Sequence, residues 1–125
     1  MQMHNTSPDG VHYLIEFFGC DRKQLNSVAF WKRTFMKSVS NTSMKVLHSH
    51  FYKFIPEGLT GYLLLSTSHI SIHTWAELSY AACDVFSCAG DEETGKTVKH
   101  IVEMVQHEKI KMKKLKRGFR VNAKT

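Results

Sequence analysis

Three strands are expected in close succession between residues 59 and 87. Leu59 to Leu65 is a nearly continuous apolar run, which is typical of a strand that is buried on both faces or lies at the centre of a sheet. Residues 68 to 73 alternate branched and polar side chains, residues 75 to 79 predict a turn, and residues 80 to 87 predict a further strand. The rest of the chain is expected to be built around these strands.

The flanking segments predict helices and additional strands. Residues 11 to 18 are rich in aromatic and branched side chains, which favours a strand. Apolar residues at helical spacing predict helices over residues 22 to 39 and 97 to 107. The other predicted segments are a strand over 44 to 55, a polar loop over 91 to 95 and an edge strand from 109 onward. This order predicts an α+β fold, a two-layer sandwich of a mostly antiparallel sheet with helices on one face.

The length of the chain fits one domain. At 125 residues it is long enough for a two-layer core and too short for two, so residues 1–125 are expected to form a single domain. No apolar run approaches the roughly 18 residues of a membrane span, and the polar start carries no signal pattern. A cytoplasmic protein without a membrane partner is therefore expected.

Much of the net charge of +6 lies in the tail from Lys109 to Lys124. A basic tail can bind nucleic acid, but these lysines are not interleaved with stacking aromatic residues in a recognised motif. Lysines on an edge strand also discourage edge-to-edge aggregation, so a solvated edge is the favoured interpretation. No nucleic acid is expected as a partner.

The cysteines and histidines were weighed as metal ligands. Cys20, Cys83 and Cys88 are an odd number at spacings that fit no disulfide framework, so reduced thiols are expected. Two histidine pairs have the even spacing that puts both side chains on one strand face, namely His48 with His50 and His69 with His73. Since no CxxC pair and no HExxH signature accompanies them, no metal is expected.

The segment from residue 68 to residue 88 carries the chemistry. It contains a hydroxyl nucleophile, two histidines and two cysteines in the order SHISIHTW, then Glu77, then YAACDVFSC from Tyr80. These residues resemble the self-processing segment of the bacterial S-adenosylmethionine decarboxylases, small pyruvoyl enzymes in which an internal serine becomes the cofactor. Looser matches flank the segment, at Glu16, Phe17, Cys20, Asp21 and Arg22 and at Phe54, Pro56, Gly58 and Gly61.

The resemblance implies that the chain cleaves itself. The hydroxyl of Ser68 would attack the carbonyl of Thr67, and β-elimination followed by hydrolysis would leave a pyruvoyl group derived from Ser68. The products would be a β chain of residues 1–67 and an α chain of residues 68–125. The ketone would form a Schiff base with the amine of a small amino-acid-type substrate and act as the electron sink for decarboxylation.

The resemblance also assigns catalytic roles. His73 is the candidate base for the elimination, Thr60 is the candidate partner of the Thr67 carbonyl, and Cys88 would return a proton after carbon dioxide leaves. Residues 68 and 73 are separated by an odd number, so in a straight strand their side chains point to opposite faces. A bend of the chain near Ser68 is therefore expected if both act on one site.

The substrate pocket is expected to use aromatic and acidic residues. By resemblance, Phe54 stacks on adenine, Phe18 is a second stacking aromatic, and Glu77 binds the ribose hydroxyls. Glu16 is added as a further substrate-binding candidate. The resemblance also implies that protomers pair through their sheets as a homodimer, whose larger assembly and activator it leaves open.

The chain departs from the family pattern at several positions. Thr67 and Gly19 stand where the family usually has glutamate, and Ala76, Leu78 and Ser79 stand where it usually has proline, an aromatic residue and glycine. Three interpretations follow. The first is S-adenosylmethionine decarboxylation for polyamine synthesis; the second is the same pyruvoyl chemistry on ornithine or arginine; the third is an unprocessed regulatory homologue.

Overall fold

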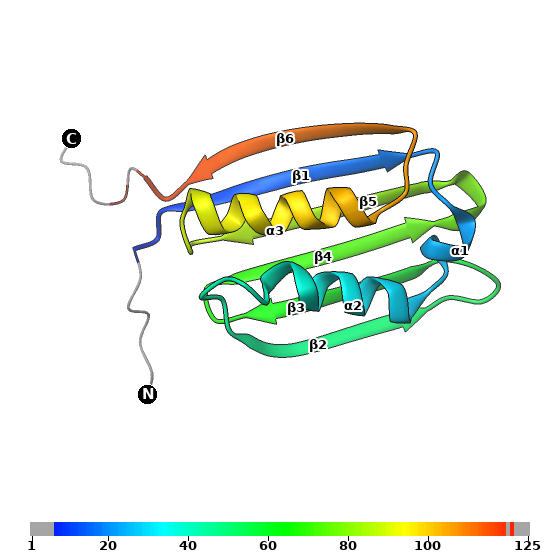
Figure 1. Cartoon of the computed structure of the whole chain (residues 1–125), viewed down its shortest axis with the longest axis horizontal. Helices are drawn as coiled ribbons and strands as arrows, with labels where there is room; N and C mark the ends of the chain where they lie inside the picture. The colour runs from blue at the N-terminus through cyan, green and yellow to red at the C-terminus, as the bar shows by residue number, and fades with distance from the viewer. Residues whose placement is uncertain (1–6, 120, 122–125) are drawn as a thin grey trace.

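A single six-stranded sheet forms the centre of the computed structural model, which describes residues 7–119 and residue 121. Its strand order is β2-β3-β4-β5-β1-β6, and every neighbouring pair is antiparallel. The strands are β1 (Gly10–Phe18), β2 (Val46–Lys53), β3 (Leu59–Leu65), β4 (Ser68–Trp75), β5 (Tyr80–Ser87) and β6 (Lys109–Arg117). Figure 1 shows both long helices on the same side of this sheet, which confirms the expected α+β sandwich.

The helices are α1 (Arg22–Leu25), α2 (Val28–Val39) and α3 (Asp91–Met104), with a 3-10 turn, η1 (Ala76–Leu78), between β4 and β5. The continuous helix expected over residues 22–39 is therefore two helices. The reason is Ser27, whose hydroxyl accepts a hydrogen bond of 3.0 Å from the Phe30 amide and so starts a new helix. None of the described helices is long and apolar enough to cross a membrane.

The expected loop over residues 91–95 is wrong, because α3 begins at Asp91. Its first turn carries Asp91, Glu92 and Glu93, whose negative charges interact favourably with the positive end of the helix dipole. The hydroxyl of Thr94 also donates to the Gly90 carbonyl at 2.7 Å. A polar sequence was thus a helix start rather than a loop, because the favourable interaction of acidic side chains with the helix dipole does not require apolar residues.

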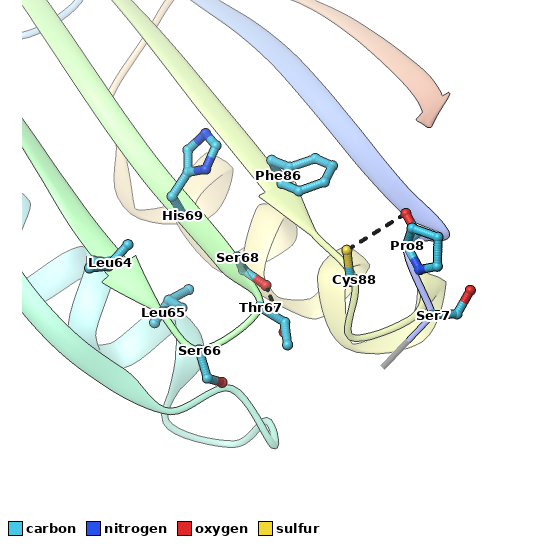
Figure 2. A pocket seen from close by; sticks show the side chains of 10 residues that line it. All are labelled: Ser7, Pro8, Leu64, Leu65, Ser66, Thr67, Ser68, His69, Phe86 and Cys88. Carbon is cyan, nitrogen blue, oxygen red and sulfur yellow. Dashed lines mark hydrogen bonds between the residues drawn. The ribbon is translucent and has the colours of Figure 1, made fainter. Parts of the chain in front are cut away.

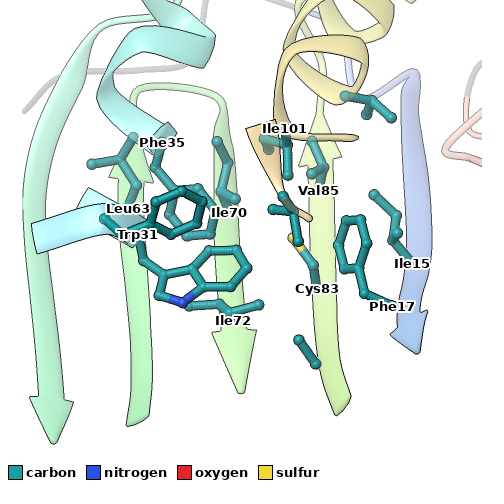
Figure 3. Packing of buried hydrophobic residues seen from close by; sticks show 14 of the residues in the cluster. Ile15, Phe17, Trp31, Phe35, Leu63, Ile70, Ile72, Cys83, Val85 and Ile101 are labelled. Carbon is teal, nitrogen blue, oxygen red and sulfur yellow. The ribbon is translucent and has the colours of Figure 1, made fainter. Parts of the chain in front are cut away.

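The core lies between the sheet and the two long helices. Figure 3 shows Trp31 and Phe35 of α2 over Leu63, Ile70 and Ile72, while Ile101 of α3 covers the neighbouring part of the sheet. Trp31 and Phe35 are fully buried, and their rings meet edge to face at 5.9 Å. Burial of these large side chains holds the helices on one face of the sheet.

The opposite face of the sheet, called the open face below, has no helix over it among the described residues. Tyr62 and Leu64 point to it and are 39% and 43% exposed, so β3 is not buried on both faces; it is an inner strand of the sheet, between β2 and β4, which is the other expected alternative. Only alternate residues of β3 face the helices. The open face therefore presents side chains from all the strands to solvent or to a partner.

The lysine-rich segment forms the edge of the sheet, as expected. It is strand β6, which pairs with β1 along its whole length, and six of its nine residues are lysine or arginine. Lys114 forms an ion pair of 2.9 Å with Asp91 at the start of α3. The rest of the predicted basic tail, residue 120 and residues 122–124, lies outside the described residues.

Candidate active site

The candidate catalytic residues lie at two opposite ends of the sheet. Strand β4 begins at Ser68, beside the end of β5 and Cys88; this is the Ser68 end. The same strand finishes past His73, beside the start of β3 and Thr60; this is the His73 end. Each end has its own set of interactions.

A cavity of about 590 Å³ marks the Ser68 end (Figure 2). Thr67, Ser68, His69, Phe86 and Cys88 line it together with the end of β3 and residues 7 and 8. The Ser68 side chain is 7% exposed, and its Oγ lies 3.4 Å from Oγ1 of Thr67. The cavity thus brings together the nucleophile, the peptide bond before it and the thiol that the sequence predicted.

The carbonyl of Thr67 accepts a hydrogen bond of 3.3 Å from the backbone amide of Cys88. An N–H aimed at a carbonyl oxygen stabilises the negative charge that develops there when a nucleophile attacks. Sequence reasoning had assigned the carbonyl partner to Thr60 and missed this amide, because a backbone contact between two loops leaves no signal in residue types.

The Cys88 thiol also lies in this cavity, with Sγ 3.9 Å from the Pro8 carbonyl oxygen. Burial raises the pKa of Cys88 above the value of a free thiol. The thiol is consequently protonated at neutral pH, which is the state that can donate a proton. Burial also raises the pKa of Cys20, to about 11, but that thiol does not line the cavity.

His69 was missed by the assignment of roles, although it lines the cavity with Ser68. Burial lowers its pKa, and the nearby His12 lowers it further, so its imidazole is neutral at pH 7. Its ring lies 5.7 Å from the Phe86 ring and 6.3 Å from the His12 ring. The even spacing of His69 and His73 had already placed both on one strand face, but the sequence analysis gave His69 no catalytic role.

At the His73 end, Nδ1 of His73 lies 2.9 Å from Oγ1 of Thr60, its cross-strand neighbour on β3. The hydrogen bond fixes the ring orientation and leaves Nε2 for another partner. Both side chains point to the open face. The two candidates therefore form a pair, but they do so away from the Thr67 carbonyl.

Three aromatic rings cluster on the open face at the His73 end. Tyr80 lies 5.5 Å from the Trp75 ring and 5.3 Å from the Phe18 ring, and it donates a hydrogen bond of 2.6 Å to the Glu16 carboxylate. This hydrogen bond, followed by burial, raises the pKa of Tyr80 to about 12. Tyr80 thus contacts two substrate-binding candidates: its ring packs against Phe18, and its hydroxyl hydrogen-bonds to Glu16.

The other two substrate-binding candidates lie at the same end. Phe54 follows β2, is 47% exposed and meets the Tyr52 ring at 5.1 Å. Glu77 lies on η1, directly after β4, and its side chain is exposed. All four substrate-binding candidates are therefore at the His73 end, whereas the cleavage site and the thiol are at the Ser68 end.

The bend expected near Ser68 is absent. β4 pairs with β5 without a register shift from Ser68 to Trp75, and its burial alternates along its length. Ser68 faces the helices and His73 faces the open side, and five residues of extended strand separate them by about 16 Å. Within one protomer, His73 does not reach Ser68.

A family model of S-adenosylmethionine decarboxylase matches residues 11–118, which is most of the chain. The chain belongs to the S-adenosylmethionine decarboxylase family. The resemblance drawn from residues 68 to 88 is thereby confirmed, and so is the expectation of an enzyme, because this is a family of pyruvoyl-dependent carboxy-lyases.

Relatives of this family match along most of their own length. The S-adenosylmethionine decarboxylase proenzyme of Sulfurihydrogenibium sp. is 39% identical over 109 residues, 87% of this chain and 82% of the relative. That of Pyrococcus abyssi is 34% identical over 116 residues, 93% of this chain and 84% of the relative. The crystal structure of the Aquifex aeolicus adenosylmethionine decarboxylase superposes with a TM-score of 0.85 at 28% identity, over 95% of this chain and 98% of that one.

One departure from the S-adenosylmethionine decarboxylase pattern, Gly19, has a structural explanation, and a second, Ser79, has a backbone conformation that favours the usual glycine. Gly19 has a φ of +66°, and a Cβ added there would lie 2.6 Å from Oε2 of Glu108. The usual glutamate would therefore be strained and would collide with an acidic side chain. Ser79 adopts the left-handed conformation, with φ 53° and ψ 38°, at the position where the family usually has glycine.

Replacing Ser79 with glycine will raise the free energy of unfolding by about 0.5–1 kcal/mol, because glycine removes the steric cost of the left-handed conformation. Chemical denaturation measures the change. Ser40→Gly is the matched control: its φ is −63°, so that variant will be destabilised. A loss of stability in Ser79→Gly would contradict the expectation.

One histidine of each pair weighed as metal ligands contacts another side chain. Among residues 7–119 and 121, no group of three or more histidine, cysteine, aspartate or glutamate side chains lies close enough to hold an ion. His48 instead meets Tyr62 at 5.9 Å, and His73 meets Thr60.

Proposed function

We propose that the chain cleaves itself between Thr67 and Ser68 and then decarboxylates S-adenosylmethionine, a step of polyamine synthesis. The observation that carries this proposal is the cavity at the Ser68 end, where Ser68, the amide-bound Thr67 carbonyl and the protonated Cys88 thiol meet. The family and the proenzyme names of the relatives support this substrate over ornithine or arginine, and self-cleavage over an unprocessed role.

Cleavage starts when Oγ of Ser68 attacks the Thr67 carbonyl carbon. The Cys88 amide stabilises the oxyanion, and departure of the Ser68 nitrogen converts the peptide bond to an ester. A base then removes the α-hydrogen of Ser68, and the Thr67 carboxylate leaves as the β chain of residues 1–67. Hydrolysis of the remaining dehydroalanine releases ammonia and gives the α chain of residues 68–125 its pyruvoyl end.

The residues present fit that group. It would occupy the place of Ser68, which is 93% buried by its surroundings and so protected from water, with Cys88 in the same cavity. Once formed, the pyruvoyl ketone supplies the electron sink that decarboxylation needs. The protonated thiol of Cys88 then returns a proton to the substrate α-carbon.

The base is provided by a second protomer in this proposal. His73 lies about 16 Å along the strand from Ser68, so one protomer holds two incomplete halves of a site. If two copies pack open face to open face about a twofold axis across the strands, the Ser68 end of one lies over the His73 end of the other. His73 and Thr60 of the partner subunit then approach the Thr67–Ser68 bond.

The open face has the character that such a homodimer needs. Leu14, Tyr62, Leu64 and Trp75 are large apolar side chains exposed on it, each between 36% and 43%. Several large apolar side chains left exposed on one face of a sheet support its use as an interaction surface. The pairing would also bring Phe54, Phe18, Glu77 and Glu16 of one protomer to the Cys88 of the other, so that substrate binding and proton return share one site.

A reducing compartment is part of the proposal. Cys20, Cys83 and Cys88 are all unpaired, and Cys88 must stay a free thiol to donate a proton. Since the cytoplasm keeps thiols reduced, it is the location that we infer.

The mass of the purified protein tests the proposed cleavage. Two fragments that divide before residue 68, the second carrying a pyruvoyl end, are expected together with release of carbon dioxide from S-adenosylmethionine. Ser68→Ala will remain one chain, because it lacks the nucleophile, whereas the neighbouring Ser66→Ala will be cleaved. A single full-length mass in the wild-type protein would make the unprocessed regulatory role the better explanation, and carbon dioxide from ornithine or arginine alone would reassign the substrate.

A further inference from the structure

The loop that follows β2, residues 54–58, is fastened to α1 by side chains that no catalytic role explains. The Arg22 guanidinium donates two hydrogen bonds to the Glu57 carboxylate, from Nε and from Nη2. Asn26 donates from Nδ2 to Oε1 of Glu57 at 3.2 Å and accepts from the Gly58 amide through Oδ1 at 2.8 Å. These residues, Arg22, Asn26 and Glu57, are called the α1 clamp below.

The same loop is closed on itself at the position of Phe54. The Phe54 amide donates to the Gly58 carbonyl at 2.9 Å, so the clamp on residues 57 and 58 also fixes the backbone of Phe54. Next to it, Thr74 at the end of β4 accepts from the Leu59 amide at 2.9 Å and donates to the Leu25 carbonyl at 2.8 Å. The backbone of Phe54 is held, while its ring stays about half exposed.

The clamp also lies near the turn that carries Glu77. The Cys20 amide, just before α1, donates to the Ser79 carbonyl at 2.9 Å and so ties this turn to the start of the helix. The hydrogen bonds and the charge of Glu57, and to a smaller extent the charge of Glu77, raise the pKa of Arg22. One short helix therefore contacts both loops that present substrate-binding candidates.

The clamp has features of a local positioning device rather than of a contribution to global stability. The Arg22 side chain is 63% exposed, and exposed ion pairs add little to the free energy of unfolding. Its two parallel hydrogen bonds nevertheless fix geometry, because a guanidinium and a carboxylate form both bonds at once only when the two groups are nearly coplanar. An ordered loop spares the ligand the entropy cost of ordering it.

We propose that Arg22 and Asn26 are positioning residues that, through Glu57, set the Phe54 ring relative to Glu77 for nucleoside recognition; this inference rests on the proposed function. They touch no reacting atom and lie at the His73 end, away from the cleavage bond. Weakening the clamp should therefore change substrate affinity and leave cleavage and the chemical step intact.

Steady-state kinetics of the processed enzyme tests the inference. Glu57→Gln and Arg22→Ala are expected to raise the KM for S-adenosylmethionine by about tenfold, with kcat within about twofold of wild type and complete self-cleavage. The charge-swapped double variant, Arg22→Glu with Glu57→Arg, restores the ion pair but removes the acceptor of Asn26 Nδ2, so it is expected to recover part of the lost affinity. Lys23→Ala, an exposed cationic residue of the same helix outside the clamp, is the matched control and should leave KM unchanged.

Unchanged KM in Glu57→Gln and Arg22→Ala, or a fall in kcat at constant KM, would overturn the inference. Failure of the proposed function is visible separately, as a wild-type protein that neither cleaves nor releases carbon dioxide. In that case, amide hydrogen exchange of the intact protein tests whether the clamp fixes the Phe54 backbone. The Phe54 amide is expected to exchange at least about tenfold faster in Glu57→Gln than in wild type or Lys23→Ala, and equal exchange would overturn the clamp itself.

Discussion

Co-expression of Ser68→Ala and His73→Ala chains will produce cleaved protein, although each variant alone will stay intact. In a mixed dimer, the Ser68→Ala protomer still carries His73 and Thr60, and the His73→Ala protomer still carries its own Ser68. The straight course of β4 keeps these groups apart within one chain, so in the proposed mechanism the partner must supply His73. We expect cleavage of the His73→Ala chain alone, which differently tagged chains will reveal by intact mass.

The matched control pairs the His73→Ala chain with a chain that carries both substitutions. That mixture has the nucleophile but no His73, and it should remain uncut. If the His73→Ala chain also stays whole beside Ser68→Ala, while wild-type protein is cleaved, the arrangement across two protomers is wrong. A His73→Ala chain that cleaves by itself would instead remove His73 from the reaction and direct attention to His69 in the cavity.

Cys88→Ser will separate the two reactions of this site. Cleavage is expected to proceed, because it uses the backbone amide of Cys88, which serine retains. Turnover of S-adenosylmethionine is expected to fall by about 10²-fold or more in kcat, because the variant lacks the thiol that we propose as the proton donor. Carbon dioxide release per processed chain is the measurement. Cys83→Ala, which removes a buried thiol on the helix side of β5, is the control and should keep kcat per folded molecule.

The pH profile adds a second readout for Cys88. Burial raises the pKa of its thiol, so the protonated, active form persists as pH rises and is lost only above that raised value. The alkaline fall of kcat should consequently lie above about 8.5, the pKa of an unperturbed thiol, and should be absent in Cys88→Ser. A fall below that pH, or one that persists in the serine variant, would contradict the assignment to Cys88.

Local sequence patterns predicted much of the secondary structure correctly. Alternation of side chains is a property of the strand backbone itself, so residues 68 to 73 and 80 to 87 could be assigned without knowledge of their neighbours. Helical spacing likewise located α2 and most of α3. The motif around Ser68 and Cys88 also identified the family, because it depends on residue identity and spacing alone.

Capping and burial were harder to predict, because they depend on contacts outside the pattern. The serine hydroxyl that divides α1 from α2 acts through one hydrogen bond to Phe30, and the acidic first turn of α3 resembles a loop in composition. Leu64 and Tyr62 belong to an apolar run that resembles a buried strand, yet they face the open side. Which face of a strand is covered depends on where distant helices pack.

The candidate site was likewise predicted only in part from the sequence. Residue types and spacing were sufficient to select Ser68, His73 and Cys88, but they suggested that the first two meet through a bend in one strand. The tertiary structure instead brings Cys88 to Ser68 through the pairing of β4 with β5, and it brings Thr60 to His73 through the pairing of β3 with β4. Pairing between strands sets these neighbours through hydrogen bonds that join residues far apart in the chain, and a straight strand separates residues that the sequence places only five positions apart.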